Sequence, residues 1–257
     1  MDLSVPPPPA LPLRAWRALR QRGPHYVWHK ALRRSLSPWP SRKRRWLYSN
    51  PRRYWTHRGG DDYFREQEGQ EARTLRCQWM AERLAAYRPA SILEVGCGYG
   101  KLLRTLRHYT NVPLVGVDFS TTQLDYASGF LADQEDIELV LGCGARLPFR
   151  DYSFDMVVTS AMVLHNPPAA AQCIRREIVR VARRFAAHNE ETCQSYNRYG
   201  YDTAAWYRVC GISLLEVGPI PVDPDPASSQ FCVAQLGSNG GKTPPDWFFL
   251  MSEQRHG

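Results

Sequence analysis

The sequence lacks several features that would place it in a special class of protein. It contains no run of about 18 uninterrupted apolar residues, so no membrane-spanning helix is predicted. Its seven cysteines are an odd number and none stand in a C-x-x-C pair, which argues against a disulfide framework or a zinc site. The first twelve residues lack the basic start and apolar core of a secretory signal. We therefore expect a cytoplasmic protein without a bound metal, with a peripheral membrane location as an alternative.

Acidic residues are nearly missing from the first 58 positions. This segment has fourteen Arg and Lys residues against one acid, Asp2, whereas the remainder of the chain is acidic by five charges. It also holds five of the eight tryptophans. We expect a basic arm over 1–58, a globular domain over 59–240 and a tail over 241–257. Three alternatives stand for the arm: it binds an anionic membrane surface, it binds nucleic acid, or it has no role.

The pattern after the arm predicts the fold class. Apolar spacing indicates a helix over 70–87, and from there short apolar strands alternate with helices. The predicted strands are 91–95, 114–117, 137–141, 154–160, 185–188, 214–217 and 231–235. The predicted helices between them are 101–108, one capped by Ser120, 168–184 and 203–209. Such alternation predicts a Rossmann-like, doubly wound and mostly parallel seven-stranded sheet with helices on both faces.

The most informative segment lies between the first strand and its helix. Glu94, Gly96, Gly98 and Gly100 occupy alternate positions there, and glycines let a ligand approach bare backbone at a helix N-terminus. The spacing differs from the dinucleotide fingerprint, and the carboxylate of Glu94 suits a cation and would repel a pyrophosphate. Asp118 closes the second strand and can accept ribose hydroxyls. Acid, glycine turn and acid together predict a site for S-adenosylmethionine.

Three motifs carry a resemblance to a known family. They are Glu94-Val-Gly-Cys-Gly-Tyr-Gly100, Val115-Gly-Val-Asp-Phe-Ser120 and Leu147-Pro-Phe-Arg-Asp-Tyr-Ser-Phe-Asp155. Together with the run 157–165 they resemble the motifs of class I S-adenosylmethionine-dependent methyltransferases. The chain is most similar to the type 11 domain, which the quinone C-methyltransferases share. The resemblance covers about 91–184, with a plausible completion of the sheet to 235.

The resemblance implies a role for each matching position. The turn formed by Gly96, Cys97, Gly98 and Gly100 would wrap the methionine portion of the cofactor, and Glu94 would lie near its amino group. Asp118 would hold the ribose, and Phe119 would lie against the adenine. Ser160 and the two residues after it would face the methionine carboxylate and the acceptor.

One position departs from the family pattern. Where family members commonly carry an Asp after the third strand, this chain has Cys143 followed by Gly144. A thiol is a poor acceptor for the adenine amino group. Backbone carbonyls would then recognise the adenine, or the affinity for the cofactor would be weaker.

Two histidines are candidates for a catalytic base, which methyl transfer needs only when the acceptor must lose a proton. His165 follows the fourth strand, and His188 begins the group His188-Asn-Glu190 at the fifth. The alternative for each is a structural hydrogen-bonding role. The loop 196–202, with Arg198, is either a lid over the acceptor or an ordinary surface loop. Segments 52–58 and 61–64 either fold over the cofactor or form a packed connector.

These observations favour a methyltransferase that uses S-adenosylmethionine on a small-molecule or lipid-like acceptor. An RNA or protein methyltransferase guided by the arm is one alternative. A cofactor-binding protein that has lost catalysis is another. The motifs do not specify the acceptor atom or an oligomeric state.

Overall fold

The computed structural model describes residues 16, 19–20, 24, 27–28, 30–36, 38–58 and 61–237. The proline tract 5–12 and the tail 241–257 lie outside the described residues. Contacts divide the chain into two units, Met1–His57 and Arg58–Gly257. Within the described part, no helix combines the length and the apolar character that crossing a membrane requires.

The described part of the first unit is helical. Residues 27–28 and 30–35 are helical, and two helices follow, α2 (Pro40–Leu47) and α3 (Pro51–Arg58). Proline stands in the first turn of α2, where its missing N–H costs no helical bond. Asn50 Oδ1 accepts a hydrogen bond from the N–H of Arg53 and so caps the start of α3. The Tyr48 and Tyr54 rings meet edge to face at 5.0 Å, which ties the two helices together.

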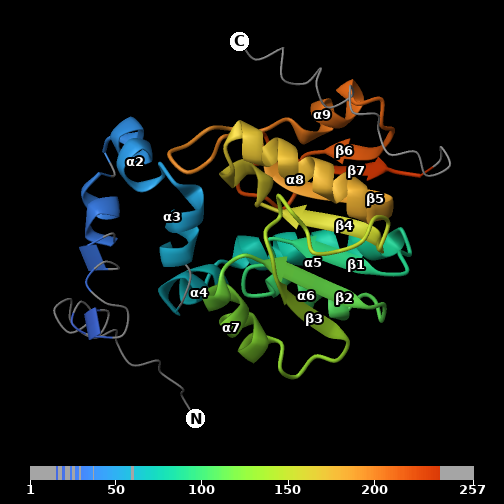
Figure 1. Cartoon of the computed structure of the whole chain (residues 1–257), viewed down its shortest axis with the longest axis horizontal. Coiled ribbons are helices and arrows are strands. Elements are labelled where there is room, and N and C mark those ends of the chain that lie inside the picture. The colour runs from blue at the N-terminus through green and yellow to red at the C-terminus, as the bar shows by residue number, and fades with distance from the viewer. Residues whose placement is uncertain are drawn as a thin grey trace. The chain divides into compact units, whose positions relative to one another are not determined.

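The second unit is built on one seven-stranded sheet with the order β3-β2-β1-β4-β5-β7-β6 (Figure 1). β7 runs antiparallel to both of its neighbours, and the other described pairs are parallel. This confirms the mostly parallel seven-stranded sheet. The strands are β1 (Ile92–Val95), β2 (Leu114–Asp118), β3 (Ile137–Leu141), β4 (Phe154–Ser160), β5 (Ala182–Glu191), β6 (Leu214–Gly218) and β7 (Ser229–Gln235).

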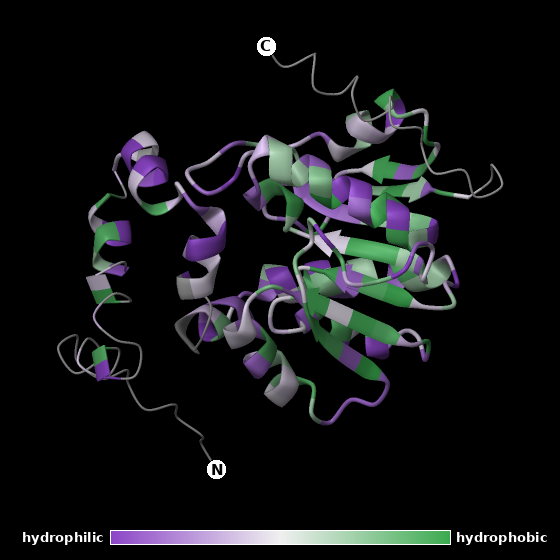
Figure 2. Cartoon of the chain, in the orientation of Figure 1, coloured by the Kyte–Doolittle hydropathy of each residue, from purple (hydrophilic) through white to green (hydrophobic). Residues whose placement is uncertain are grey.

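Helices cover both faces of this sheet, as predicted. They are α4 (Asp61–Glu68), α5 (Glu71–Ala86), α6 (Lys101–Arg107), α7 (Thr121–Phe130), α8 (Pro168–Val181) and α9 (Thr203–Val209), with a short 3₁₀ helix, η1 (Val163–His165). Side chains of one strand alternate between two cores. Ile92 belongs to the core with α5 and α6, whereas Leu93 belongs to the core with α8 and α9. Figure 2 shows the resulting apolar central strands between helices of mixed polarity.

The boundary predicted between the helix 168–184 and the strand that follows it is wrong. The helix expected over 168–184 ends at Val181, and β5 begins at once with Ala182, three residues before the expected strand. β5 pairs with β4 from Ala182 onward, and Asp155 on β4, whose side chain is 1% exposed, adds two ion pairs there. Arg183 Nη2 lies 3.0 Å from Asp155 Oδ1, and Arg184 Nη1 lies 2.8 Å from Oδ2. These ion pairs hold both arginines in the extended strand although local spacing favours a helix.

Candidate functional site

The candidate site lies where the strand order reverses. β1 pairs with β2 on one side and with β4 on the other, so the chain runs outward from β1 through β2 to β3 and then crosses back to β4 on the other side of β1. In open parallel sheets, ligands bind at such a switch point beside the carboxyl ends of the strands. Here these ends bring together the turn after β1, Asp118 at the end of β2 and Ser160 at the end of β4.

The turn after β1 is held in a left-handed conformation that favours glycine. Gly96, Gly98 and Gly100 have φ of 75°, 56° and 86°. A Cβ at Gly96 would lie 2.3 Å from Met162 Cγ, and one at Gly100 would lie 2.7 Å from Leu131 Cδ1. A Cβ at Gly98 would meet no described atom within 4 Å. Protein packing therefore requires the outer two glycines, while Gly98 presents bare backbone to open space.

Asp118 fixes the shape of this turn. Its carboxylate is mostly buried, and Oδ2 accepts a 2.9 Å hydrogen bond from the N–H of Gly98. Oδ1 accepts a second 2.9 Å bond from the N–H of Ser120, whose hydroxyl caps α7. Burial raises the pKa of Asp118, against these backbone hydrogen bonds. Each carboxylate oxygen has a second lone pair, so the residue can hold the turn and still accept a ligand hydroxyl.

Glu94 is a buried acid with an unfilled acceptor. The residue is 3% exposed, and its Oε2 has no hydrogen-bond partner among the described residues. Burial raises the pKa of Glu94 to about 8, with Asp118 adding to the rise and Arg73 opposing it. Buried carboxylate oxygens in proteins almost always have a donor. A cationic group bound beside the turn would supply the missing donor and charge.

Arg73, on α5, is a site residue that the sequence analysis missed. Its Nη1 donates to Gln67 Oε1 at 2.7 Å, and its guanidinium lies 5.9 Å from the centre of the Tyr99 ring. Its buried Nε has no hydrogen-bond partner in the described part of the chain. Arg73 precedes the buried Cys77 and Met80 by four and seven residues, so it continues the sheet-facing side of α5. An arginine on that apolar face was the available signal.

Helix α4 is fastened to the same turn. Glu68 Oε1 accepts hydrogen bonds from Tyr99 Oη and from Lys101 Nζ, both at 2.9 Å. Tyr99 lies within the glycine turn, and Lys101, the first residue of α6, is only 7% exposed. These bonds hold the C-terminal end of α4 at the edge of the site and favour the packed-connector alternative for 61–64. The side chains of Asp61 and Asp62 lie outside the described residues.

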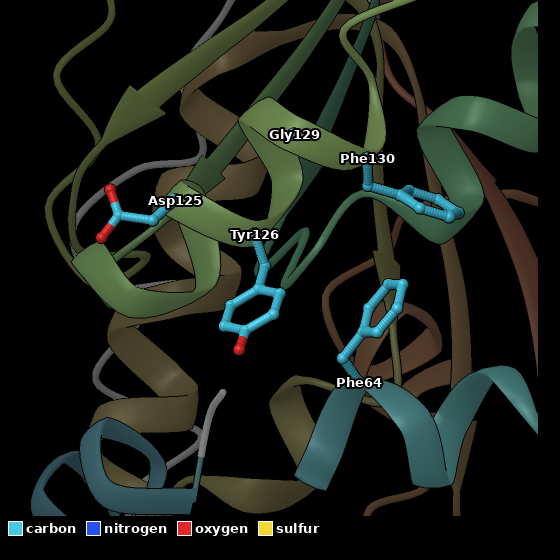
Figure 3. Close-up of a pocket in the computed structure, with 5 residues that line it drawn as sticks. All are labelled: Phe64, Asp125, Tyr126, Gly129 and Phe130. Carbon is cyan, nitrogen blue, oxygen red and sulfur yellow. The ribbon is translucent and has the colours of Figure 1, made fainter. Parts of the chain in front are cut away.

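A shallow cavity of about 470 Å³ lies beside this connector, between α4 and α7 (Figure 3). In Figure 3 the rings of Phe64, Tyr126 and Phe130 face one another, whereas the Asp125 carboxylate points away. The Phe64 ring centre is 5.8 Å from that of Tyr126 and 5.6 Å from that of Phe130. The cavity contains none of the predicted site residues, so it is not the site that the motifs describe.

On the far side of the crevice, Glu190 is a buried acid with both carboxylate oxygens hydrogen-bonded. It is 1% exposed at the end of β5. Its Oε1 accepts from Thr159 Oγ1 at 2.8 Å and from the N–H of Val163 at 3.1 Å. Its Oε2 accepts from the N–H of Leu164 at 3.0 Å. Glu190 therefore anchors the loop after β4, which carries His165.

His188 is enclosed by the protein. It is 0% exposed, its Nδ1 lies 2.8 Å from Thr159 Oγ1, and its Nε2 lies 2.7 Å from Tyr207 Oη. Burial lowers the pKa of His188 to about 3, with the charge of Arg175 adding to the effect. A ring with both nitrogens engaged and no exposed surface has the geometry of a structural hydrogen-bonding residue. The arrangement favours that alternative over a catalytic base.

His165 is placed differently, in η1 and partly exposed. Its Nδ1 lies 2.6 Å from the carbonyl oxygen of Asn197, so Nδ1 carries the proton. Burial lowers the pKa of His165 to about 4. The ring is therefore neutral at pH 7. Of the two histidines, His165 retains the geometry of a candidate base.

The loop 196–202, whose Asn197 carbonyl contacts His165, is itself packed. Arg198 pairs with Glu191, and the N–H of Tyr199 donates to the Leu164 carbonyl at 2.7 Å. The hydroxyl of Tyr201 donates to the Asn166 carbonyl at 2.7 Å. These bonds tie 196–202 to the loop after β4 and favour a packed surface loop over a mobile lid.

The other predicted site residues surround the crevice at their strand ends. Ser160 Oγ accepts a 3.0 Å hydrogen bond from Asn189 Nδ2. Cys97 is buried, and burial raises the pKa of its thiol far above the ordinary value, which makes it a poor nucleophile. Phe119, Cys143 and Gly144 are each partly exposed after β2 or β3. A Cβ at Gly144 would lie 3.1 Å from Val95 Cγ1, so the segment after β3 closely approaches β1.

Comparisons with known proteins agree with this fold. Residues 92–184 match a family model described as a methyltransferase domain. Over 116 residues the chain is 30% identical to Methyltransferase GfsG of Streptomyces halstedii, a match that covers 44% of this chain and 41% of that protein. The chain thus spans about two fifths of the length of that curated relative.

Two solved structures show the likeness in three dimensions. Phosphoethanolamine N-methyltransferase 1 of Haemonchus contortus, in complex with phosphoethanolamine and S-adenosylhomocysteine, superposes with a TM-score of 0.61 at 11% identity. That match covers 82% of this chain and 53% of the other. Magnesium protoporphyrin IX methyltransferase of Synechocystis PCC 6803, with bound S-adenosylhomocysteine, gives a TM-score of 0.56 at 16% identity, covering 68% and 94%. At these identities the likeness establishes the fold alone.

Proposed function

We propose that this protein is an S-adenosylmethionine-dependent methyltransferase of the type 11 kind. The observation that carries the proposal is the unfilled, buried oxygen of Glu94 beside the open backbone of Gly98. The zwitterionic amino-acid end of S-adenosylmethionine has an ammonium group that fits this oxygen. The matched methyltransferase domain over 92–184 contains both residues.

The residues present fit the cofactor at each end. Glu94 would accept from the ammonium group, and Arg73, whose buried Nε lacks a described partner, would hold the carboxylate. Asp118 would use its remaining lone pairs for the ribose hydroxyls, and Phe119 would lie against the adenine. When bound, the cofactor supplies an activated methyl group on a sulfonium. The protein's contribution is mainly to hold that group in line with an acceptor.

The proposed acceptor is a small or lipid-like molecule. The two solved neighbours are named for a phosphoethanolamine and a magnesium porphyrin, both small acceptors. For an acceptor that must lose a proton, the partly exposed His165 would be the base, whereas His188 has no exposed surface. An RNA or protein acceptor, or a cofactor-binding role without catalysis, would be the alternatives.

The first test is a calorimetric titration of the full chain with S-adenosylmethionine and S-adenosylhomocysteine. We expect micromolar binding of both, and a loss of about thirtyfold in affinity for Glu94→Gln, because the charge that pairs with the ammonium group is removed. Glu138→Gln is the matched control, since Glu138 is an exposed acid on β3. Equal affinities for the two variants, or no binding by the folded protein, would refute the proposed cofactor site.

The second test separates the enzyme from an inactive binding protein. The protein is incubated with methyl-labelled S-adenosylmethionine and separate pools of small metabolites, lipid extract, RNA and protein. Transfer into the small-molecule or lipid pool supports the proposal, and transfer only into RNA or protein supports the arm-guided alternative. Cofactor binding without transfer into any pool would favour a domain without catalysis. Cys143→Asp would then show whether restoring the acceptor after β3 strengthens cofactor binding.

A further inference from the structure

One surface of the first unit is unexplained by methyl transfer. Arg42, Arg45 and Trp46 lie on one exposed side of α2, and Trp39, the N-cap residue of this helix, stands seven residues before Trp46. We call these four residues the Trp-Arg face. Trp39 is 53% exposed and Trp46 is 66% exposed. Tryptophan is the largest apolar side chain, and two such rings on one exposed helical face indicate a binding surface.

The opposite side of α2 is buried, so only one side of this helix is exposed. Lys43 and Leu47 lie one turn apart there and are 9% and 4% exposed. The helix thus has an inner face that packs and an outer face that carries indole rings and guanidinium groups. The Arg42 guanidinium lies 6.0 Å from the centre of the Trp39 ring.

The two units differ in the tryptophans that they expose. Among the described residues, every exposed tryptophan lies in the first unit: Trp16, Trp28, Trp39 and Trp46. The exposed large apolar residues of the second unit are aliphatic apart from Tyr109. The first 58 residues also carry fourteen basic groups against one acid. Exposed indoles and excess positive charge therefore occur in the same segment.

From this coincidence we infer that the Trp-Arg face docks the protein on a bilayer that contains anionic lipids. Indole rings favour the interface between headgroups and acyl chains, where one edge is apolar and the N–H stays hydrated. Arginines beside them bind headgroup phosphates and gain from the negative surface potential. The helix lies on the surface and does not cross it. A single helix face is convex, whereas single-stranded nucleic acid is held in a groove, so the geometry favours the bilayer over single-stranded nucleic acid.

The test is flotation of the full chain with vesicles of phosphatidylcholine containing 30% phosphatidylserine, alongside vesicles of phosphatidylcholine alone. We expect binding to the first and little to the second, with roughly thirtyfold weaker binding for Arg42→Gln/Arg45→Gln. Trp39→Ala/Trp46→Ala should weaken binding roughly tenfold or more. The matched controls are Arg150→Gln/Arg208→Gln and Tyr109→Ala, exposed residues of the second unit. These should bind as the unaltered chain does, and calorimetry with S-adenosylmethionine or a melting curve shows that all variants are folded.

Three results would overturn the inference. The first is equal flotation of the Trp-Arg variants and the controls. The second is binding to poly(U) through these four residues with no binding to anionic vesicles, which would identify nucleic acid as the partner. The third is protection of Trp39 and Trp46 from iodide quenching in the free protein, which would show that the face is covered within the chain. Quenching of the same two residues by brominated lipid is the result that supports docking.

Discussion

Two buried glutamates, one on each side of the crevice, have opposite uses. Glu94 and Glu190 are 3% and 1% exposed, and burial raises the pKa of both. Glu190 accepts hydrogen bonds from Thr159 and from backbone N–H groups of the loop after β4. Glu94 keeps one oxygen without a described partner. Burial and a raised pKa therefore do not identify a ligand site. A buried carboxylate oxygen that lacks a hydrogen-bond donor does identify one.

Replacing Glu190, the acid with both oxygens hydrogen-bonded, should have the largest effect on stability. Glu190→Ala leaves buried N–H groups at Val163 and Leu164 without an acceptor, so we expect the free energy of unfolding to fall by about 3 kcal/mol. Urea unfolding followed by circular dichroism measures this. Glu138→Ala, at an exposed position, is the control. A loss below about 1 kcal/mol would mean that the loop does not depend on this anchor.

Two glycines of the turn allow the same comparison between a residue required by protein packing and a residue open to a ligand. Gly100→Ala meets Leu131 and Gly98→Ala meets no described atom, although both have positive φ. We expect a loss of about 1 kcal/mol in unfolding free energy for Gly98→Ala and at least about 2 kcal/mol for Gly100→Ala. Only Gly98→Ala should weaken cofactor binding more than its loss of stability explains. Gly129→Ala, in a helix with open space, should be neutral or stabilising. The reverse order of the two stabilities would contradict this account.

The pKa of Glu94 predicts a proton linkage on binding. With a folded-state pKa of about 8, Glu94 is mostly protonated at pH 7 and must ionise to pair with an ammonium group. We expect close to one proton to be released on binding at pH 7, and affinity to rise by up to about tenfold per unit as the pH rises from 6 toward 8. Calorimetry in phosphate and in Tris measures the released proton. The dependence of cofactor affinity on pH should disappear in Glu94→Gln. Equal heats of binding in the two buffers would argue against proton release by Glu94.

The smallest expected effect concerns the histidines. The pKa of His165 is lowered to about 4 and that of His188 to about 3, so both rings are neutral from pH 5.5 upward. The pH–rate profile should therefore show no histidine inflection near 6.5. His165→Gln should slow transfer to acceptors that lose a proton and leave cofactor affinity unchanged. An inflection near 6.5 that disappears in His165→Gln would show that the ring titrates in the working enzyme.

The sequence predicts what is local and misses what depends on distant partners. The glycine turn and the strands β3 and β4 could be located residue by residue, because their signals lie within a few positions. The early start of β5 could not, since Arg183 and Arg184 are held by Asp155 in another strand. Arg73 was missed for the same reason: its place beside Glu94 depends on how α5 packs across the sheet.

The position of β7 determines when the sheet can be completed. This strand, the last along the described residues, lies between β5 and β6, antiparallel to both. During synthesis, β5 therefore has one unpaired edge, and β6 has no neighbour, until residue 235 has left the ribosome. At about 5–20 residues per second, that interval lasts a few seconds. An open edge on a ten-residue interior strand can pair with other chains, so nascent copies of this protein are most exposed to aggregation during that interval.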